Sequence, residues 1–593
     1  MYISQLRIKN FRVFDEIILS LNKGINILIG ENNSGKTAII DALRICLGYG
    51  KSDTNIYIQE SDLHLNTSDP LDINSKIQFD LIFEIESDIE RHIFYDFISQ
   101  DPQDIERQTI QFHLKYSLEQ NGRRMFFKRT VWGGDNEGQQ VPYEALQEIF
   151  YTYLGPLRDA VTGLRPYSYD NKTAQLFNKL TKYKKGNSNI NLDENMKTNL
   201  ADKLYSVFES ADHDWKFILD EGKGKVNEHL QGTGILNKFP RIEMNYVGRK
   251  FSDVVKGIEI RRPIFTEPIE PRLQKYFEIF QNGLGENNLI YSSVVLGDLM
   301  NRCEDQELEI YNALLLEEPE AHLHPQYQNT FFEYLNTLTD KGLQVFVTSH
   351  SPTITAKSNI GNVKVLQRQD DSVKAFCFNA LSEVDYSNEN KKHLRKFLDT
   401  TKSQMFFANG VILVEGISEA ILLPILSSRF LNPHQINIEK SGVEIVNIGG
   451  VAFEHFAKLY NHDDEKKRFF SKCAIITDSD PKGDKHVSDR ALKAQGLKRH
   501  NLEVTLANHT FEYDLFETSQ TNKSIMRRVY RNMHPQTEDL FSDFTAETLM
   551  QKLKQNKDKA EFALQLCDVL ITEPNFDVPL YIKTAIEFVV PIQ

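Results

Sequence analysis

The first residues of the chain alternate between apolar and polar positions and then become almost wholly apolar. The alternation over 2–19 is typical of the two strands of a hairpin. The run Ile25-Asn26-Ile27-Leu28-Ile29 predicts a short buried strand. Apolar residues from Ala38 to Leu47 then recur at the spacing of an amphipathic helix. The pattern predicts a hairpin, a buried strand and a helix, in that order.

A glycine-rich loop joins this strand to this helix, which is the context that a P-loop requires. Glycines let the backbone wrap around phosphates while its N–H groups face the anion. Lys36 would reach the β- and γ-phosphates, and the Thr37 hydroxyl would bind Mg²⁺. A turn without a ligand is the alternative, which the full pattern disfavours. The residues expected to bind the nucleotide are Gly30, Asn32, Asn33, Gly35, Lys36 and Thr37.

Two further apolar runs, over 310–316 and 345–347, predict buried strands that end in polar residues. The first is followed by Glu317 and Glu318. Beside phosphates, Glu317 would bind Mg²⁺ and the nucleotide, and Glu318 would activate water. His350 follows the second strand and would contact the γ-phosphate or position the attacking water. Taken one at a time, an acidic turn and a structural histidine remain the alternatives.

These segments together resemble the ABC/SMC/RecF-type ATPases. Asn10-Phe11-Arg12 is similar to the opening pattern of that family, 317–325 to its Walker B and D-loop, and His350 to its switch histidine. The spacing of His322 and His324 also suits a metal site, but the resemblance implies a loop at a subunit interface.

Two segments of this half bear on regulation and assembly. The family's signature loop is usually Leu-Ser-Gly-Gly-Gln, whereas this chain has Gly283-Leu284-Gly285-Glu286-Asn287-Asn288. This departure leaves the rate of hydrolysis open and favours ATP as a signal of state. Residues 173–237 are polar and helix-like. We expect a helical insertion there, either a dimerisation arm or a solvent-exposed helical hairpin.

A second α/β pattern begins after a charged helical connector at 376–409. Apolar runs at 411–414, 443–448 and 474–477, separated by helices, predict a small parallel sheet. Acids follow two of these strands, and the carboxyl ends of parallel strands converge on one rim. Clustered carboxylates repel one another unless cations neutralise them, and oxygen ligands suit Mg²⁺ or Mn²⁺. A metal pair there would serve phosphodiester cleavage. The acids that carry this prediction are Glu415, Asp478 and Asp480.

The strand-end Glu415 and the pair Asp478 and Asp480 resemble the Toprim domain. An ABC ATPase followed by Toprim resembles the OLD family of nucleases (overcoming lysogenisation defect), which includes the nuclease subunit of the Gabija antiphage system. The resemblance implies that Glu419 and Glu512 are metal ligands, with Asp514 as a neighbour or substitute for Glu512. It implies that Lys559 stabilises transition-state charge, for which a solvated helix lysine is the alternative. Basic residues that would hold the DNA backbone are Lys482, Lys485, Arg490, Lys493, Lys498 and Arg499.

Composition changes this picture little. The formal net charge of −14 is unusual for a protein that binds nucleic acid, but binding depends on local fields. Five scattered cysteines without a Cys-x-x-Cys pair favour a reducing cytoplasm. We expect no signal peptide and no membrane partner, because no apolar run is long enough to span a bilayer.

The sequence thus predicts an α/β chain with an ABC-type P-loop ATPase and a C-terminal Toprim domain. We expect the ATPase in two pieces, at 1–172 and 238–375, with the helical insertion at 173–237 between them. A connector at 376–409 then leads to the Toprim domain at 410–593. The predicted function is that of an ATP-regulated, metal-dependent DNA endonuclease or nickase in antiphage defence. We expect a homodimer or higher homo-oligomer, with a helicase or a retron as candidate partners.

Two other functions stay open at this point. One is a RecF-like repair ATPase whose Toprim domain binds DNA without cutting it. The other is a topoisomerase-like strand-passage enzyme, which needs a nucleophilic tyrosine. The chain has 23 tyrosines, none in a recognisable motif for that chemistry.

Overall fold

The computed structural model describes most of the chain, and the residues form two compact units. One unit holds 1–153, 310–320 and 325–593, and the other holds 154–309 and 321–324. This division is coarser than the predicted domain boundaries, which stay a prediction. The described residues are 1–51, 56–64, 75–100, 107–121, 124–139, 141–156, 160–185, 188–209, 214–232, 250–264, 275–304, 310–369, 372–399, 401–431, 438–450, 452–481, 487–535 and 544–590.

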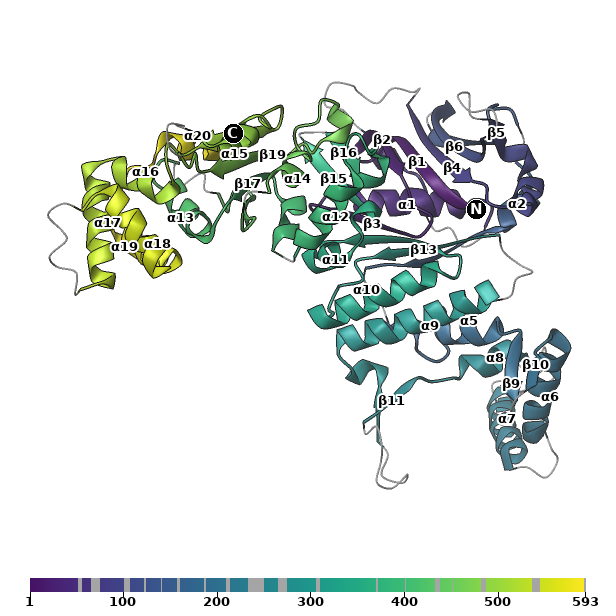
Figure 1. Cartoon of the computed structure of the whole chain (residues 1–593). Coiled ribbons are helices and arrows are strands. Elements are labelled where there is room, and N and C mark those ends of the chain that lie inside the picture. Colours follow the sequence, from purple (N-terminus) through teal and green to yellow (C-terminus); the bar gives the residue numbers. More distant parts are fainter. Residues whose placement is uncertain are drawn as a thin grey trace. The chain divides into compact units, whose positions relative to one another are not determined.

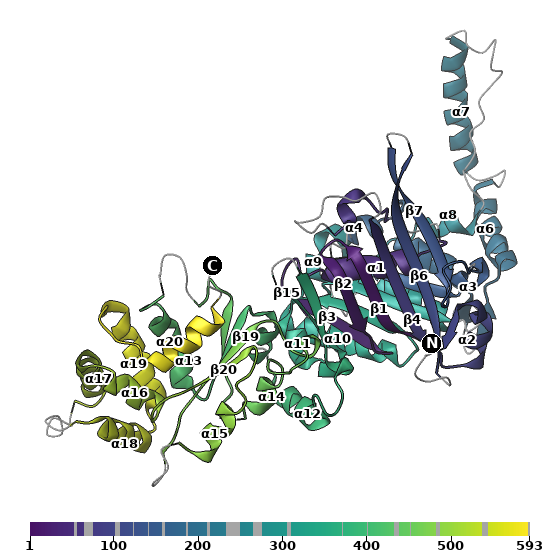
Figure 2. The ribbon, with the colours of Figure 1, turned by 90° about the horizontal axis from the view of Figure 1, so that it is seen from above.

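The first unit begins with an antiparallel sheet in the order β2-β1-β4-β6-β5, with β7 paired to β6 (Figure 2). The predicted hairpin is confirmed as β1 and β2, in which Leu6 lies opposite Leu19. The strands are β1 (Tyr2–Phe11), β2 (Phe14–Ser20), β4 (Lys76–Glu84), β5 (Ile98–Gln100), β6 (Gln108–Asn121) and β7 (Arg124–Gly133). Short helices near this sheet are α2 (Asp88–Ile93) and α3 (Tyr143–Gln147).

A second sheet in this unit brings the nucleotide motifs together, in the order β16-β15-β3-β14-β13-β8. The strands β15, β3, β14 and β13 are parallel, as buried strands linked by helices require. The bounds are β3 (Ile25–Gly30), β8 (Ile149–Leu154), β13 (Tyr311–Glu317), β14 (Gln344–Ser349), β15 (Val363–Gln369) and β16 (Ser372–Cys377). The three strands predicted around the P-loop, Walker B and His350 are therefore confirmed as neighbours.

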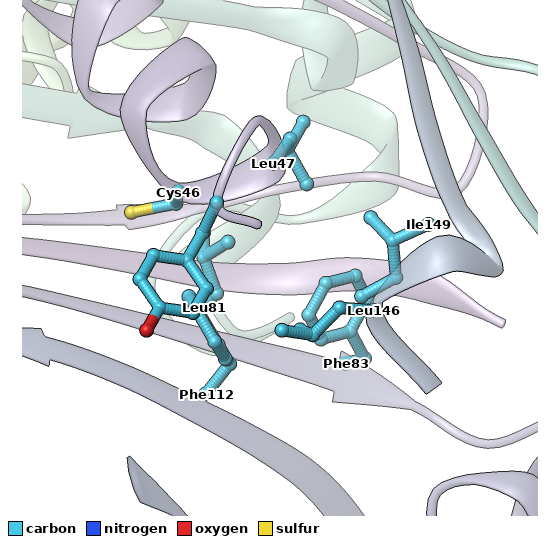
Figure 3. Close-up of a pocket in the computed structure, with 8 residues that line it drawn as sticks. Cys46, Leu47, Leu81, Phe83, Phe112, Leu146 and Ile149 are labelled. Carbon is cyan, nitrogen blue, oxygen red and sulfur yellow. The ribbon is translucent and has the colours of Figure 1, made fainter. Parts of the chain in front are cut away.

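Helix α1 (Lys36–Leu47) contacts strands of both sheets. Its apolar residues are buried on nearly every side, because β3, β13 and β14 contact it as well as β4. Figure 3 shows Cys46 and Leu47 facing Leu81, Phe83 and Phe112. The space left among these side chains has essentially no room for a water molecule. Close packing of this kind holds the helix, and with it the P-loop, in one position. The remaining helices of the ATPase part are α10 (Pro325–Thr339), α11 (Pro352–Lys357) and α12 (Asn388–Phe397).

The second unit contains most of the predicted helical insertion. Helices are present as expected, but residues 182–185 and 188–191 form two antiparallel strands that the spacing of apolar residues did not predict. Residues 186–187, 210–213 and 233–237 of the insertion lie outside the described part. The elements are α4 (Ala160–Gly163), α5 (Lys172–Asn178), β9 (Lys182–Lys185), β10 (Ser188–Asn191), α6 (Glu194–Glu209), α7 (Asp214–Gly232), α8 (Phe251–Lys256), β11 (Arg261–Pro263), β12 (Tyr276–Glu278) and α9 (Leu284–Glu304).

The C-terminal part of the first unit is a parallel sheet in the order β18-β17-β19-β20. The three predicted strands are confirmed, and β20 is a fourth that was not predicted. Helix α20 packs on the sheet, and α16 to α19 gather beside it (Figure 1). The elements are β17 (Gly410–Val414), α13 (Ile417–Ser427), β18 (Val443–Asn447), α14 (Glu454–Ala457), β19 (Lys472–Thr477), α15 (Asp489–Gln495), β20 (Leu502–Leu506), α16 (Phe511–Glu517), α17 (Gln520–Met533), α18 (Ala546–Asn556), α19 (Lys559–Thr572) and α20 (Leu580–Val589).

A cluster of aromatic rings lies between β16 and the segment that precedes β19. Phe469 is fully buried at its centre, with its ring centroid 4.5 Å from that of Phe376 and 5.3 Å from that of Tyr460. Phe378 and Phe406 complete the cluster in edge-to-face contacts. Edge-to-face pairs add to the free energy of burying each ring. The cluster therefore joins the ATPase sheet to the C-terminal sheet within this unit.

We expect Phe469→Ala to destabilise this unit. Removing a buried phenyl ring leaves a cavity that costs about 3 kcal/mol or more, so the apparent Tm should fall by roughly 5 °C or more. Phe126→Ala, at a ring that is 40% exposed, is the control and should change Tm little. Equal Tm values for the two variants, measured by thermal unfolding, would show that the cluster does not stabilise the unit.

Candidate functional site

The P-loop connects β3 to α1, and its two glycines are required by the backbone. Gly30 has φ 151° and Gly35 has φ 88°, both in the region that favours glycine. A Cβ on Gly30 would lie 2.3 Å from the carbonyl oxygen of Leu366. One on Gly35 would lie 2.4 Å from the ring of Phe14. The loop can follow this path only with glycine at both positions.

Lys36 lies inside the curve of this loop. Its Nζ donates hydrogen bonds to the carbonyl oxygens of Gly30 at 2.8 Å and of Glu31 at 2.7 Å. Burial lowers the pKa of Lys36 to about 8, and the charges of Glu318 and Glu320 oppose that shift. The ammonium group is thus buried against neutral carbonyls, which is an environment that an anionic phosphate would improve. Thr37, Asn32 and Asn33 are exposed beside it.

The carboxyl ends of β13 and β14 place the predicted Walker B acids and His350 together. Glu317 is 2% exposed and accepts a hydrogen bond from the Tyr153 hydroxyl at 2.7 Å. Burial, and then Glu317, raise the pKa of Tyr153 well above its usual range. Glu318 has φ 44° and lies with its Oε1 3.7 Å from Nε2 of His350. Burial, and then the charge of Lys36, lower the pKa of His350, so a neutral imidazole is favoured.

Glu320 positions the segment that carries His350, a role that the sequence did not indicate. Its Oε1 accepts hydrogen bonds from the Ser349 hydroxyl at 2.9 Å and from the His350 backbone N–H at 2.7 Å. Its Oε2 is buried and has no hydrogen-bond partner among the described residues. The third acid of Glu-Glu-Pro-Glu could have indicated this positioning role, because a carboxylate two residues beyond Glu318 can reach the end of the neighbouring strand.

In the second unit, the signature-like loop lies at the start of α9. A Cβ on Gly285 would lie 2.4 Å from the carbonyl oxygen of His322, and Asn288 Nδ2 donates to the Ala321 carbonyl at 3.5 Å. The loop and the predicted D-loop are therefore in contact. His322 and His324 have exposed side chains and belong to no potential metal-binding group within the described ranges.

Five predicted acids gather at the carboxyl edge of the C-terminal sheet. Glu415 follows β17, Asp478 and Asp480 follow β19, and Glu419 and Glu512 lie in the first turns of α13 and α16. The Thr477 hydroxyl and the Asp478 backbone N–H donate to Glu415 Oε1. Asp478 Oδ1 accepts a hydrogen bond from the Phe511 N–H at 2.9 Å, so the start of α16 is tied to the end of β19.

These acids are close enough to oppose one another's ionisation. Burial, and then the charges of Glu415, Glu512, Glu419 and Asp480, raise the pKa of Asp478 to about 8. Burial, together with Glu512 and Glu415, raises the pKa of Glu419 to about 7. Carboxylates held in this way are stabilised by any cation that binds among them. We refer to Glu415, Glu419, Asp478, Asp480 and Glu512 as the acidic rim.

The structure gives Glu512, which the resemblance favours as a metal ligand, different contacts from those of Asp514. Lys559 Nζ lies 3.0 Å from Glu512 Oε2. Burial acts to lower the pKa of Lys559, but Glu512, Asp478 and Glu419 outweigh it and raise the pKa. Asp514 instead accepts the backbone N–H groups of Asn508 at 2.6 Å and His509 at 3.2 Å. Glu512 therefore belongs to the rim with Lys559, and Asp514 holds the loop after β20.

The donor chemistry of the acidic rim fits a hard divalent cation, because every member supplies carboxylate oxygens. No group of three or more His, Cys, Asp or Glu side chains in the described ranges is arranged as a metal-ligand set. Protein donors occupy the oxygens instead. These donors are Thr477, Arg490, Lys559 and the N–H groups of Asp478 and Phe511.

The predicted DNA-binding residues are only partly described. Lys482 and Lys485 lie outside the described residues. Lys498 pairs with Glu503 at 2.6 Å, and Arg499 with Asp463 at 3.1 Å. Arg490 contacts Glu415 and Asp480 of the acidic rim. The structure thus gives these basic residues separate environments.

Comparison with known proteins agrees with this division of the chain. A model of the AAA ATPase domain family matches residues 1–355, which is more than half of the chain. The chain belongs to that family. A model described as overcoming lysogenization defect protein-like, TOPRIM domain, matches residues 406–480. The predicted fold class and the resemblance to OLD proteins are confirmed, and these two domain types use a nucleotide and a divalent metal ion, respectively.

Curated relatives are similar to this AAA ATPase chain over different shares of its length. Endonuclease GajA of Bacillus cereus (strain HuB5-5) is 22% identical over 99% of both chains. The OLD nuclease of Thermus scotoductus is 23% identical over 76% of this chain and 78% of its own. The Old nuclease of Escherichia phage P2 is 24% identical over 45% of this chain and 48% of its own.

Solved structures with some likeness include an SMC head and an OLD protein. The SmcHead bound to the C-winged helix domain of ScpA has 15% identity and a TM-score of 0.33, over 63% of this chain and 97% of its own. The C-terminal region of the Burkholderia pseudomallei OLD protein has 21% identity and a TM-score of 0.25, over 31% and 97%.

The predicted site residues thus fall into two groups that the fold assembles, although their chemical roles stay predictions. One group surrounds the P-loop and the other forms the acidic rim with Lys559. Three contacts were missed because each depends on a neighbouring element, namely those of Tyr153, Glu320 and Arg490. In the described part of the chain, no helix has the length and apolar character needed to cross a membrane.

We expect Glu512→Gln and Asp514→Asn to have different effects. Glu512→Gln removes a rim charge and should weaken Mn²⁺ binding by about tenfold or more, with little loss of stability. Asp514→Asn weakens two hydrogen bonds to buried backbone and should cost about 1–3 kcal/mol of stability, with little change in Mn²⁺ affinity. Isothermal titration with Mn²⁺ and thermal unfolding measure the two effects, and the opposite pattern would reverse the assignment.

Proposed function

We propose that this chain is an ATP-regulated, divalent-metal-dependent DNA endonuclease or nickase that acts in antiphage defence. The observation that carries the proposal is the acidic rim with Lys559 beside it. Carboxylates from four segments meet at one sheet edge, where burial, and then the charges of the other acids, raise the pKa of Asp478 to about 8. Burying so much like charge is costly, and a site that handles cations and phosphates accounts for it.

Glu415, Glu419, Asp478, Asp480 and Glu512 would hold Mg²⁺, or Mn²⁺ as the alternative. A divalent cation bound there lowers the pKa of water and stabilises a leaving phosphate oxygen. Hydrogen bonds from Thr477 and from the Phe511 N–H orient Glu415 and Asp478.

Lys559 would stabilise the negative charge that develops on the phosphate during cleavage. It lies at the start of α19 with its Nζ 3.0 Å from Glu512, so its charge is held beside the rim before substrate arrives. A cation that is already in place needs no reorganisation as charge develops. This is the arrangement expected of an electrostatic catalyst, and it disfavours the alternative of a solvated helix lysine.

The similar proteins support the same activity. Their names describe an endonuclease and nucleases, and the likeness to endonuclease GajA extends over 99% of both chains. That extent makes DNA the substrate we propose and antiphage defence the role.

The ATPase part would bind ATP·Mg²⁺ as a regulatory ligand. Lys36 would contact the phosphates, Thr37 and Glu317 the metal ion, and Glu318 and His350 the attacking water. In ATPases with a signature loop, the loop of one subunit faces the nucleotide of another. We therefore propose a homodimer or higher homo-oligomer, in which the departure from Leu-Ser-Gly-Gly-Gln slows hydrolysis. A helicase or a retron remains a candidate additional partner.

Plasmid cleavage in Mg²⁺ or Mn²⁺, with and without ATP, tests the nuclease. Asp478→Ala should lower cleavage by about 10³-fold or more because it removes a central rim ligand, and ATP binding should be unchanged. Lys36→Ala should lose ATP binding and the response of cleavage to ATP. Asp463→Ala, an exposed acid of the same part, is the control.

Two outcomes would contradict the proposal. If neither metal supports cleavage in any nucleotide state while DNA still binds, the RecF-like alternative without cleavage is favoured. A trapped covalent link between protein and DNA would favour the topoisomerase-like alternative.

A short path of contacts supports regulation of one site by the other. Leu366 pairs with Gly30 of the P-loop in the sheet, and its carbonyl oxygen packs against that glycine. The next residue, Gln367, accepts a hydrogen bond from the Phe470 N–H at 2.9 Å and donates one to Ser471 Oγ at 3.1 Å. Ser471 immediately precedes β19, which ends beside Asp478. A shift of the P-loop backbone on nucleotide binding therefore has a direct route to the acidic rim.

We expect Gln367→Ala to weaken this coupling. Cleavage without nucleotide and the affinity for ATP should stay within about twofold, since Gln367 touches neither site. The ratio of cleavage rates with and without ATP should move towards one. Arg368→Ala, at the exposed neighbouring position, is the control. An unchanged ratio in Gln367→Ala would exclude Gln367 from the route.

A further inference from the structure

Arg490 makes a contact in the acidic rim that neither its neighbours in sequence nor the metal-ligand prediction indicate. It lies in α15, whose first turn is capped by Ser488. Its Nη2 is 3.1 Å from both carboxylate oxygens of Glu415 and 3.1 Å from Oδ2 of Asp480. One nitrogen of the guanidinium thus joins acids that follow two different strands, β17 and β19.

The rest of the guanidinium is available to another ligand. In the part of the chain that the structure describes, Arg490 Nε and Nη1 donate no hydrogen bond, and the side chain is 41% exposed. A guanidinium has five N–H donors in a planar fork that matches the oxygens of a phosphate. Arg490 therefore holds two carboxylates with one nitrogen, and its full fork of donors can meet a phosphate only after that nitrogen is released.

The carboxylates that Arg490 holds are two of those that we propose as metal ligands. Oxygens that accept hydrogen bonds from a guanidinium are less available to a cation, so the two must compete. The ion pairs are partly exposed, and such pairs contribute little free energy, which makes them easy to break. A divalent cation among several carboxylates gains more from the same oxygens than a single guanidinium charge does.

We propose that Arg490 and a divalent cation compete for Glu415 and Asp480, and that the displaced guanidinium binds a backbone phosphate of DNA beside the rim. The proposal rests on the proposed function, because it takes the acidic rim as the metal site and DNA as the substrate. Arg490 is then a phosphate-binding residue that is blocked until the metal site is loaded. Metal binding strengthens DNA binding, and DNA binding strengthens metal binding by the same factor.

The first test measures metal affinity of the full chain without DNA or nucleotide, by isothermal titration with Ca²⁺ and with Mn²⁺. Arg490→Ala should bind either ion several-fold to about tenfold more tightly, because the competitor is gone. Arg490→Gln, which keeps a polar side chain, should show the same gain. Lys493→Ala removes an equal charge one turn further along α15 and should change affinity less than about twofold.

This test is decisive because the two possible roles of Arg490 predict different changes in metal affinity. If Arg490 merely relieves repulsion among the acids, its removal would weaken metal binding or leave it unchanged, and either result would overturn the proposal. Thermal unfolding of each variant shows whether the fold is kept. Arg490→Gln decides the matter if Arg490→Ala unfolds.

The second test measures binding of a fluorescent DNA duplex by anisotropy, in Ca²⁺ and in EDTA. Wild-type protein should bind DNA about tenfold more tightly in Ca²⁺ than in EDTA, as typical couplings between sites allow. Arg490→Ala should match wild type in EDTA and lose most of the gain in Ca²⁺. Arg490→Lys should recover part of that gain, because an ammonium carries the charge without the fork. If Ca²⁺ strengthens DNA binding equally in wild type and Arg490→Ala, Arg490 does not bind a DNA phosphate and that part of the proposal is wrong.

Neither measurement requires cleavage, so failure of the proposal for Arg490 can be distinguished from failure of the proposed function. A chain that shows the competition but never cuts plasmid DNA would keep the role of Arg490 and lose the nuclease. A chain that cuts DNA but shows no gain in metal affinity in Arg490→Ala would keep the nuclease and lose the competition.

Discussion

The repulsion among carboxylates at the end of a parallel sheet is the constraint on which the C-terminal half depends. Strands β17 and β19 run in the same direction, so the residues that follow them meet at one edge. Helices α13 and α16 add Glu419 and Glu512 from the sides. Thr477, Lys559 and two backbone N–H groups each neutralise or orient one of the acids, and Arg490 contacts two of them.

The ATPase half presents the same geometry with the opposite charge at its centre. Strands β3, β13 and β14 are parallel neighbours, so the P-loop, the Walker B acids and His350 meet at one edge. There Lys36 is the buried charge, and Glu318 and Glu320 offset it. Each half therefore has a site whose charge a ligand would balance. A phosphate would balance Lys36 in the ATPase half, and a cation would balance the acidic rim in the C-terminal half.

Short contacts connect the segments that carry the two sites. Strand β15 lies beside the P-loop strand, and Gln367 at its end hydrogen-bonds the segment that begins β19. The aromatic cluster around Phe469 holds this segment in place. If ATP acts as a signal of state, as we propose, this connection gives that state a physical route to the acidic rim.

The sequence by itself determined the elements that carry the motifs, because each depends on local pattern. Apolar runs predicted β3, β13, β14, β17, β18 and β19, and glycine with positive φ explains why the P-loop needs Gly30 and Gly35. Only the tertiary structure shows that Glu512 contacts Lys559 whereas Asp514 contacts backbone N–H groups, since the two side chains have the same chemistry. The same holds for Glu320, Tyr153 and Arg490, whose partners lie on other elements. Local pattern specifies strands and helices, whereas the pairing of charges depends on which of their ends meet in space.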